Sequence, residues 1–112
     1  MKKKHTYTLR SFQKVYREGH FFSYGVCGIQ LCNNSQKGFH WGVAVSSKKW
    51  RRAHERNRIK RILREAVYPL LPFIRPTYDI IFVFRGNKED IVFDKVKKDI
   101  ETLLNQRKNI FL

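Results

Sequence analysis

The side chains with the clearest chemical potential in this chain are cations, and most of them fall in one stretch. Residues 48–64 hold nine Lys and Arg side chains, and only Glu55 opposes them there. Arg dominates the set, and its planar guanidinium can hold two phosphate oxygens at once. The pattern therefore indicates a surface that binds a polyanion. The nine cations are Lys48, Lys49, Arg51, Arg52, Arg56, Arg58, Lys60, Arg61 and Arg64.

The second half of this stretch predicts an amphipathic helix over about residues 53–68. Apolar side chains recur there at helical spacing and form one stripe, and Pro69 and Pro72 then stop the helix. The stripe consists of Ile59, Ile62, Leu63, Ala66 and Val67.

The polar side chains of this helix point in more than one direction, so one helix could contact two separate segments of phosphate backbone. A merely solvated face would mix acids among its cations at i+4 spacing, and only Glu65 is available for that. The sequence therefore favours nucleic acid as the partner. The side chains opposite the stripe are Asn57, Lys60, Arg61 and Arg64, with Arg56 and Arg58 towards its flanks.

Composition supports this interpretation. The chain has 112 residues, which predicts a single domain over 1–112, and 24 Lys+Arg against 9 Asp+Glu give a net charge of +15. Repulsion on that scale is explained by a polyanionic partner, with nucleic acid first and an anionic membrane surface second. The membrane alternative is weak because no apolar run reaches the roughly 18 residues of a spanning helix, and no secretory signal follows the basic start.

Two aromatic side chains of the first predicted helix could contact nucleobases. Leu9, Phe12, Val15 and Tyr16 recur at helical spacing, with Thr8 as a possible cap and Gly19 as a possible end. Aromatic rings beside a basic groove hold single-stranded nucleic acid by stacking. Ordinary core packing is the other interpretation of Phe12 and Tyr16, and spacing alone leaves both open.

The remaining titratable residues do not suggest a protein active site. The histidines, at positions 5, 20, 40 and 54, lack metal-ligand spacing, and the acids gather around the last predicted helix beside lysines. We expect no catalytic residue and no metal site in the protein. Cys27 and Cys32 fall on opposite faces if their segment is a strand, so they are expected to be free thiols in a reducing compartment.

The elements that position these residues predict an α+β fold. Residues 21–32 and 39–45 are expected to be strands that form a hairpin, and residues 78–84 a strand covered on both faces. A final helix of about four turns carries an apolar stripe. The order indicates a two-layer sandwich of a mixed sheet with about three helices, in which the basic helix connects two strands. The final stripe is Phe93, Val96, Ile100, Leu103 and Leu104.

Residues 51–65, RRAHERNRIKRILRE, closely resemble the signature of the protein subunit of bacterial ribonuclease P, an Arg-Asn-Arg core followed by a basic helix. The resemblance extends to SFQKVYREG in the first helix, to GVAVSSKK before the motif, and to YDIIFVF after it. It implies a cytoplasmic ribonucleoprotein endonuclease in tRNA processing. In this family a large RNA removes the 5′ leader of precursor tRNA with Mg²⁺ bound mainly by RNA and substrate. The protein binds that RNA and the leader and is not expected to be active alone.

The resemblance also implies the fold and the sites. The fold would be similar to the second domain of a small-subunit ribosomal protein, with a left-handed crossover where the general rule expects a right-handed one. Apart from the resemblance, we expect residues 1–7 to be a flexible basic terminus. Phe12, Tyr16 and part of the sheet would line the leader cleft, with Tyr24 as a candidate. The family usually has two lysines after the strand, and here Ser47 and Lys48 stand there, followed by Lys49. The RNA-binding surface would be Arg56, Asn57, Arg58, Lys60, Arg61 and Arg64, with Lys48, Lys49, Arg51 and Arg52 before it.

Two other classes share this size and charge. A ribosome-associated structural protein is the main alternative, and composition cannot separate it from the ribonuclease P subunit. A DNA-binding regulator is disfavoured because no second helix lies a short turn before the basic one and no dimerisation seam is evident. We therefore expect RNA partners and no DNA.

Overall fold

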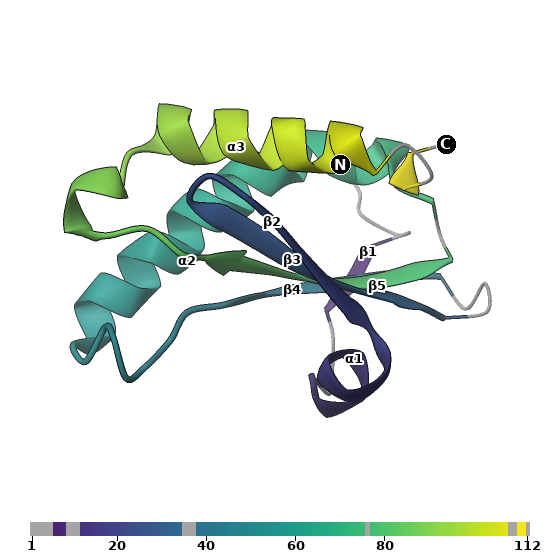
Figure 1. The fold of residues 1–112 in the computed structure, drawn as a ribbon, viewed down its shortest axis with the longest axis horizontal. Coiled ribbons are helices and arrows are strands. Elements are labelled where there is room, and N and C mark those ends of the chain that lie inside the picture. The colour runs from purple at the N-terminus through teal and green to yellow at the C-terminus, as the bar shows by residue number, and fades with distance from the viewer. Residues whose placement is uncertain (1–5, 9–11, 35–37, 76, 108–109, 112) are drawn as a thin grey trace.

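The computed structural model describes residues 6–8, 12–34, 38–75, 77–107 and 110–111, and of 6–8 the backbone only (Figure 1). The helices and strands form an α+β fold. They are β1 (Thr6–Thr8), α1 (Gln13–Glu18), β2 (His20–Tyr24), β3 (Cys27–Asn33), β4 (Phe39–Ala44), α2 (Ala53–Val67), the 3₁₀ helix η1 (Tyr68–Phe73), β5 (Tyr78–Phe84), the 3₁₀ helix η2 (Lys88–Asp90) and α3 (Phe93–Gln106).

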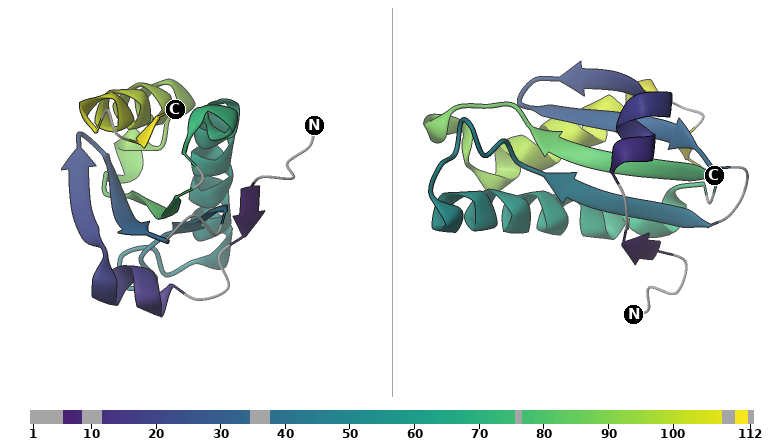
Figure 2. Two further views of the ribbon diagram at one scale, coloured as in Figure 1. Left: turned by 90° about the vertical axis from the view of Figure 1, so that its right-hand side faces the viewer. Right: turned by 90° about the horizontal axis from the view of Figure 1, so that it is seen from below.

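The strands form one mixed sheet in the order β1-β4-β5-β3-β2. β1, β4 and β5 are parallel, whereas β3 runs antiparallel to both β5 and β2. α2 and α3 cover one face of the sheet, and the short α1 lies against the other (Figures 1 and 2). The predicted α+β architecture with a mixed sheet and three helices is confirmed, and α1 adds a small layer of its own.

The predicted hairpin between residues 21–32 and 39–45 is wrong. Residues 21–32 form two strands, β2 and β3, which turn at Gly25 with a φ of 58°. The backbone N–H of the next residue, Val26, donates to the Asp99 carboxylate of α3 at 3.0 Å, which fixes the turn against that helix. β3 then pairs with β5, which lies between β3 and β4. The most apolar strand takes the centre of the sheet, where both of its faces are covered.

Thr6 and Tyr7, within the segment 1–7 that was expected to be flexible, belong to β1 and pair with Phe39 and His40 of β4. Thr8 ends this strand and does not cap α1, which begins after Phe12 without a side-chain cap. β1 forms because it can hydrogen-bond to the edge of β4, and local helical spacing in the sequence cannot predict such a long-range pairing. Leu9, predicted in the first helix, lies outside the described residues.

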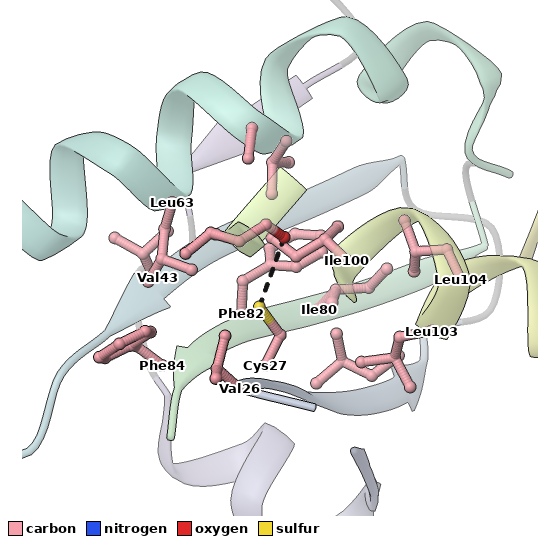
Figure 3. Close-up of a cluster of buried hydrophobic side chains, with 14 of the residues drawn as sticks. Val26, Cys27, Val43, Leu63, Ile80, Phe82, Phe84, Ile100, Leu103 and Leu104 are labelled. Carbon is pink, nitrogen blue, oxygen red and sulfur yellow. Dashed lines mark hydrogen bonds between the residues drawn. The ribbon is translucent and has the colours of Figure 1, made fainter. Parts of the chain in front are cut away.

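The core fills the space between the sheet and the helices α2 and α3. Phe82 and Ile80 of β5, Leu63 of α2 and Ile100 of α3 are fully buried there, and Figure 3 shows these side chains converging. The stripes predicted for the two long helices are therefore the faces that pack, although Phe93 stays partly exposed and Ile62 is half-buried. Cys27 lies in this core and Cys32 on the opposite face, and both are free thiols, as their spacing predicts.

α2 makes the crossover between the parallel neighbours β4 and β5. The helix ends at Val67, and Pro69 and Pro72 fall within η1, so the two prolines stop the α-helix where the sequence predicts. The left hand of this crossover stays a prediction from the family. The outer side of α2, opposite its buried apolar stripe, faces away from the core.

Candidate nucleic-acid interface

The outer side of α2 carries the predicted basic surface. Ile59 and Leu63 are buried on the inner side, at 1% and 0% exposure, so the helix rotation is fixed. Lys60 is half-buried, and the remaining polar residues opposite the stripe are exposed. The exposed polar side chains point in more than one direction, since Arg58 lies on a flank of the stripe and the others lie opposite it. The exposed members are Asn57, Arg58, Arg61 and Arg64.

Arg56 differs from these residues because its guanidinium makes contacts within the protein. Its Nη1 donates to the backbone carbonyl of Trp50 at 2.8 Å and to that of Arg51 at 2.9 Å. Trp50 is buried and packs against Phe84, with ring centroids 6.1 Å apart. Arg56 therefore fixes the segment that leads into α2. Arg51 and Arg52 themselves are exposed there.

The lysines after β4 have different surroundings. Lys49 donates from Nζ to the carbonyl of Gly86 at 2.8 Å and to Oδ1 of Asn87 at 3.0 Å. It thereby joins the loop after β4 to the loop after β5. Ser47 and Lys48 are exposed in a turn, and Lys48 makes no such contacts among the described residues. Sequence alone cannot separate the two adjacent lysines.

The cations of α2 lack carboxylate partners among the described residues. Across the part of the chain that the structure describes, no salt bridge joins a cation of α2 to a carboxylate. The ion pairs at i,i+4 spacing are on α3, where Lys97 contacts Glu101 at 2.9 Å. The outer side of α2 is thus a field of uncompensated positive charge, which attracts phosphate.

The other face of the sheet carries the aromatic pair of α1. Val15 is buried against Cys32 and Ile81, which orients the helix. Phe12 is half-buried beside this cluster, and Tyr16 is 49% exposed. The rings meet edge to face with centroids 6.4 Å apart. Partial burial raises the pKa of Tyr16, so its hydroxyl stays protonated at neutral pH. Phe12 therefore packs, whereas Tyr16 presents a ring to solvent, and its contact with a nucleobase stays a prediction.

The register of β2 with β3 determines which β2 side chains lie on the same face of the sheet as α1. Phe21 lies opposite Gln30, and Gln30 donates from Nε2 to the carbonyl of Val15 in α1. Residues opposite each other in an antiparallel pair share a face, so Phe21 is on the α1 face. Tyr24 lies opposite Cys27, whose side chain is in the α3 core. The structure therefore does not bring Tyr24 to the surface of Phe12 and Tyr16.

Phe21 is the aromatic residue of this face that the sequence reasoning missed. Its side chain is 47% exposed, and its ring crosses Gly28 so closely that a Cβ there would lie 2.6 Å from Cζ. The Arg85 guanidinium lies 5.4 Å from the ring centroid. The adjacent pair Phe21 and Phe22 is the signal that could have found it, because neighbours in a strand point to opposite faces.

Among the described residues, the histidines and acids form no second candidate site. Within the described residues there is no group of three or more His, Cys, Asp or Glu side chains that could hold a metal ion. Of the histidines, His20 and His54 are exposed. His40 contacts Asp79 through Nδ1 at 3.0 Å, and Asn34 donates to the same carboxylate at 2.8 Å. In the same part of the chain, no helix has the length and apolarity to cross a membrane.

Comparison with known proteins gives a consistent result. The family described as Ribonuclease P matches residues 1–108. The ribonuclease P protein component of Lactobacillus johnsonii is 34% identical over 102 residues, which cover 90% of this chain and 84% of the relative. That of Clostridioides difficile is 33% identical over 96 residues, covering 85% of this chain and 83% of the relative.

Solved structures agree with the sequence relatives. The RNase P protein of Staphylococcus aureus superimposes with a TM-score of 0.79 at 29% identity, covering 95% of this chain and 98% of that one. The RNase P protein of Thermotoga maritima, at 22% identity, shares the fold with a TM-score of 0.70, over 87% of this chain and 91% of that one. These matches decide against the ribosome-associated alternative. The chain belongs to the ribonuclease P protein family and is the protein component of that tRNA-processing endoribonuclease.

Proposed function

We propose that this protein binds the large catalytic RNA of ribonuclease P and the 5′ leader of precursor tRNA, and so assists removal of the leader. The RNA carries the catalysis, and the protein alone is inactive. The complex works in the cytoplasm.

The uncompensated charge of α2 carries the proposal of RNA binding. Arg58, Arg61 and Arg64 are exposed and have no carboxylate partner among the described residues. Each can neutralise phosphate and release counterions, which is the main source of sequence-independent affinity for nucleic acid. Lys48 and the arginines at 51 and 52 extend this surface towards the loop after β4.

The aromatic side chains of the α1 face support leader binding. A leader is single-stranded, so its bases are free to stack on exposed rings such as Tyr16 and Phe21. Arg85 beside Phe21 supplies a cation for the backbone. The sheet lies between this face and the helices α2 and α3, so one protein could hold two RNA segments at once.

In this proposal Mg²⁺ is bound by RNA and not by the protein. Phosphate oxygens are ligands that Mg²⁺ accepts while it keeps several waters, so the RNA subunit and the substrate would hold the ions. The protein's part is positional: it would place the leader beside the catalytic RNA.

The test compares precursor and mature tRNA on the assembled holoenzyme. Tyr16→Ala should weaken binding of precursor tRNA by about 1–3 kcal/mol, the usual value of one stacked base, and leave mature tRNA unchanged. Tyr24→Ala is the matched control, since Tyr24 is 41% exposed but lies on the other face. It should change neither dissociation constant.

Equal losses for the two tRNAs in the Tyr16 variant would refute the leader assignment. Circular dichroism checks folding, and a Tyr16→Ala chain that unfolds would show that the ring belongs to the core.

A further inference from the structure

A surface hollow lies where α2 passes into η1, beyond the residues assigned above to the leader. Its volume is about 460 Å³, and it is lined by Arg64, Glu65, Tyr68 and Pro69. Tyr68 is 47% exposed, so its ring is open to a ligand. The hollow follows directly on Arg64, at the end of the basic surface of α2.

The Tyr68 ring is held in place from the core side. It meets the ring of Trp41 edge to face, with centroids 6.4 Å apart, and Trp41 in turn meets the buried Phe82 at 6.3 Å. The Tyr68 backbone N–H bonds the carbonyl of Arg64, and Pro69 restricts the backbone that follows. Because the ring is already ordered, a flat ligand could stack on it at little entropic cost.

The polar groups of the hollow have opposite charges. Arg64 offers donors for a phosphate. Glu65 is exposed, and among the described residues no cation pairs with its carboxylate. A lone carboxylate on a phosphate-binding surface repels the RNA backbone unless it accepts hydrogen bonds from a base. Guanine is the base that presents two neighbouring N–H donors, N1 and N2, to one carboxylate.

We propose that this hollow binds an unpaired guanosine of the RNA that α2 contacts. The base stacks on Tyr68 and Pro69, its N1–H and N2–H donate to Glu65, and Arg64 holds the adjoining phosphate. Stacking on an aromatic ring and hydrogen bonding along the base edge are the usual means by which proteins recognise unpaired RNA. This proposal rests on the proposed function, because it assigns one nucleotide to the RNA that the basic surface would bind.

The experiment probes guanines in ribonuclease P RNA reconstituted with the protein. Kethoxal modifies N1 and N2 of unpaired guanine, so a guanine held by Glu65 should lose reactivity in the wild-type complex. Tyr68→Ala and Glu65→Gln should each restore it. Tyr68→Phe keeps the ring and should retain protection, as should Phe73→Ala, which removes a 61% exposed ring that does not line the hollow.

Affinity gives a second measurement in the same samples. Tyr68→Ala should weaken binding of the RNA by at least about fivefold, which corresponds to ~1 kcal/mol for one stacked base. The Phe73 variant should bind like the wild type.

The outcomes separate this inference from the function on which it rests. If the wild type binds the RNA and no guanine depends on Tyr68 or Glu65 for protection, the hollow does not hold guanosine. Dimethyl sulfate modifies N1 of unpaired adenine, and protection of an adenine from it that depends on Tyr68 would overturn the choice of base. An affinity loss without any change in base reactivity would assign the ring to packing. Failure of the wild type to bind the RNA at all would instead refute the proposed function, and this inference with it.

Discussion

The two faces of the sheet differ in how much apolar surface they cover. Against α2 and α3, 21 described residues form one buried cluster, whereas against α1 only Val15, Cys32 and Ile81 are buried together. The two long helices cover their face, while α1 has six residues and leaves Phe21 and Tyr16 exposed on the other. One face therefore supplies most of the hydrophobic stabilisation, and the other keeps aromatic rings available for a ligand.

The largest expected effect tests where stability resides. Phe82→Ala should lower the free energy of unfolding by about 3–5 kcal/mol, because the ring is fully buried at the centre of the large cluster. Val15→Ala on the α1 face should cost about 2 kcal/mol, the loss of two buried carbons plus a small cavity. Urea denaturation followed by circular dichroism measures both. Equal losses would mean that the two faces stabilise the fold alike.

A second prediction concerns the contact that holds the β2–β3 turn on the α3 side. Asp99→Ala leaves the buried N–H of Val26 without its acceptor, which should cost about 1–3 kcal/mol. Glu101→Ala breaks only the partly exposed pair with Lys97 and should cost less than about 0.5 kcal/mol. Thermal unfolding of the two variants compares them. Similar melting temperatures would show that the turn does not depend on Asp99.

The third prediction uses the thiol of the large cluster. Burial raises the pKa of Cys27 to about 12 from its ordinary value of 9.0, and the Asp99 carboxylate adds to this shift while Lys95 opposes it. The folded state holds the proton more tightly, so this contribution to stability is complete below pH 9 and is lost as the pH rises towards 12.

Unfolding in urea at pH 8 and pH 10 measures this loss, which should be about 1 kcal/mol. The Cys27→Ala variant should lose less stability over the same interval, because it retains every other titrating group. If wild type and variant fall in parallel, the thiol does not titrate as its burial requires.

The smallest expected effect belongs to the outer surface of α2. If about six phosphates are contacted, log K for the RNA should fall against log salt with a slope of about −4 to −5. Arg58→Ala should make that slope less negative by about 0.7–0.9 and leave the fold intact, since Arg58 is exposed and off the apolar stripe. Filter binding over a salt series gives both slopes. An unchanged slope would remove Arg58 from the phosphate contacts.

The long helices and the central strand could be predicted from the sequence, whereas the strand pairing and the facing of β2 could not. Helical periodicity identified α2 and α3, and the apolar run of residues 78–84 identified the central strand, because these signals are local and strong. Pairing of β4 with β1 and β5 is decided by strands far along the chain and left no local trace. The face of a β2 residue depends on where the turn falls, and a shift of one position exchanges Phe21 for Phe22. The resemblance to the family offered Tyr24 as a candidate for the leader surface, and only the register of β2 with β3 reveals that Phe21, not Tyr24, shares the face of α1.

The central place of β5 has a consequence for how the chain is made. β3 and β4 are synthesised first, yet each pairs with β5 and not with the other. Until residues 78–84 have left the ribosome, the edges of β3 and β4 that pair with β5 have no partner. The basic helix α2 likewise has no completed core to pack on. We therefore expect folding to wait for the second half of the chain. It should be slow for a protein of this length, because the central strand pairs with residues distant in the sequence. During that interval the nascent chain already exposes its excess of positive charge beside the RNA of the ribosome.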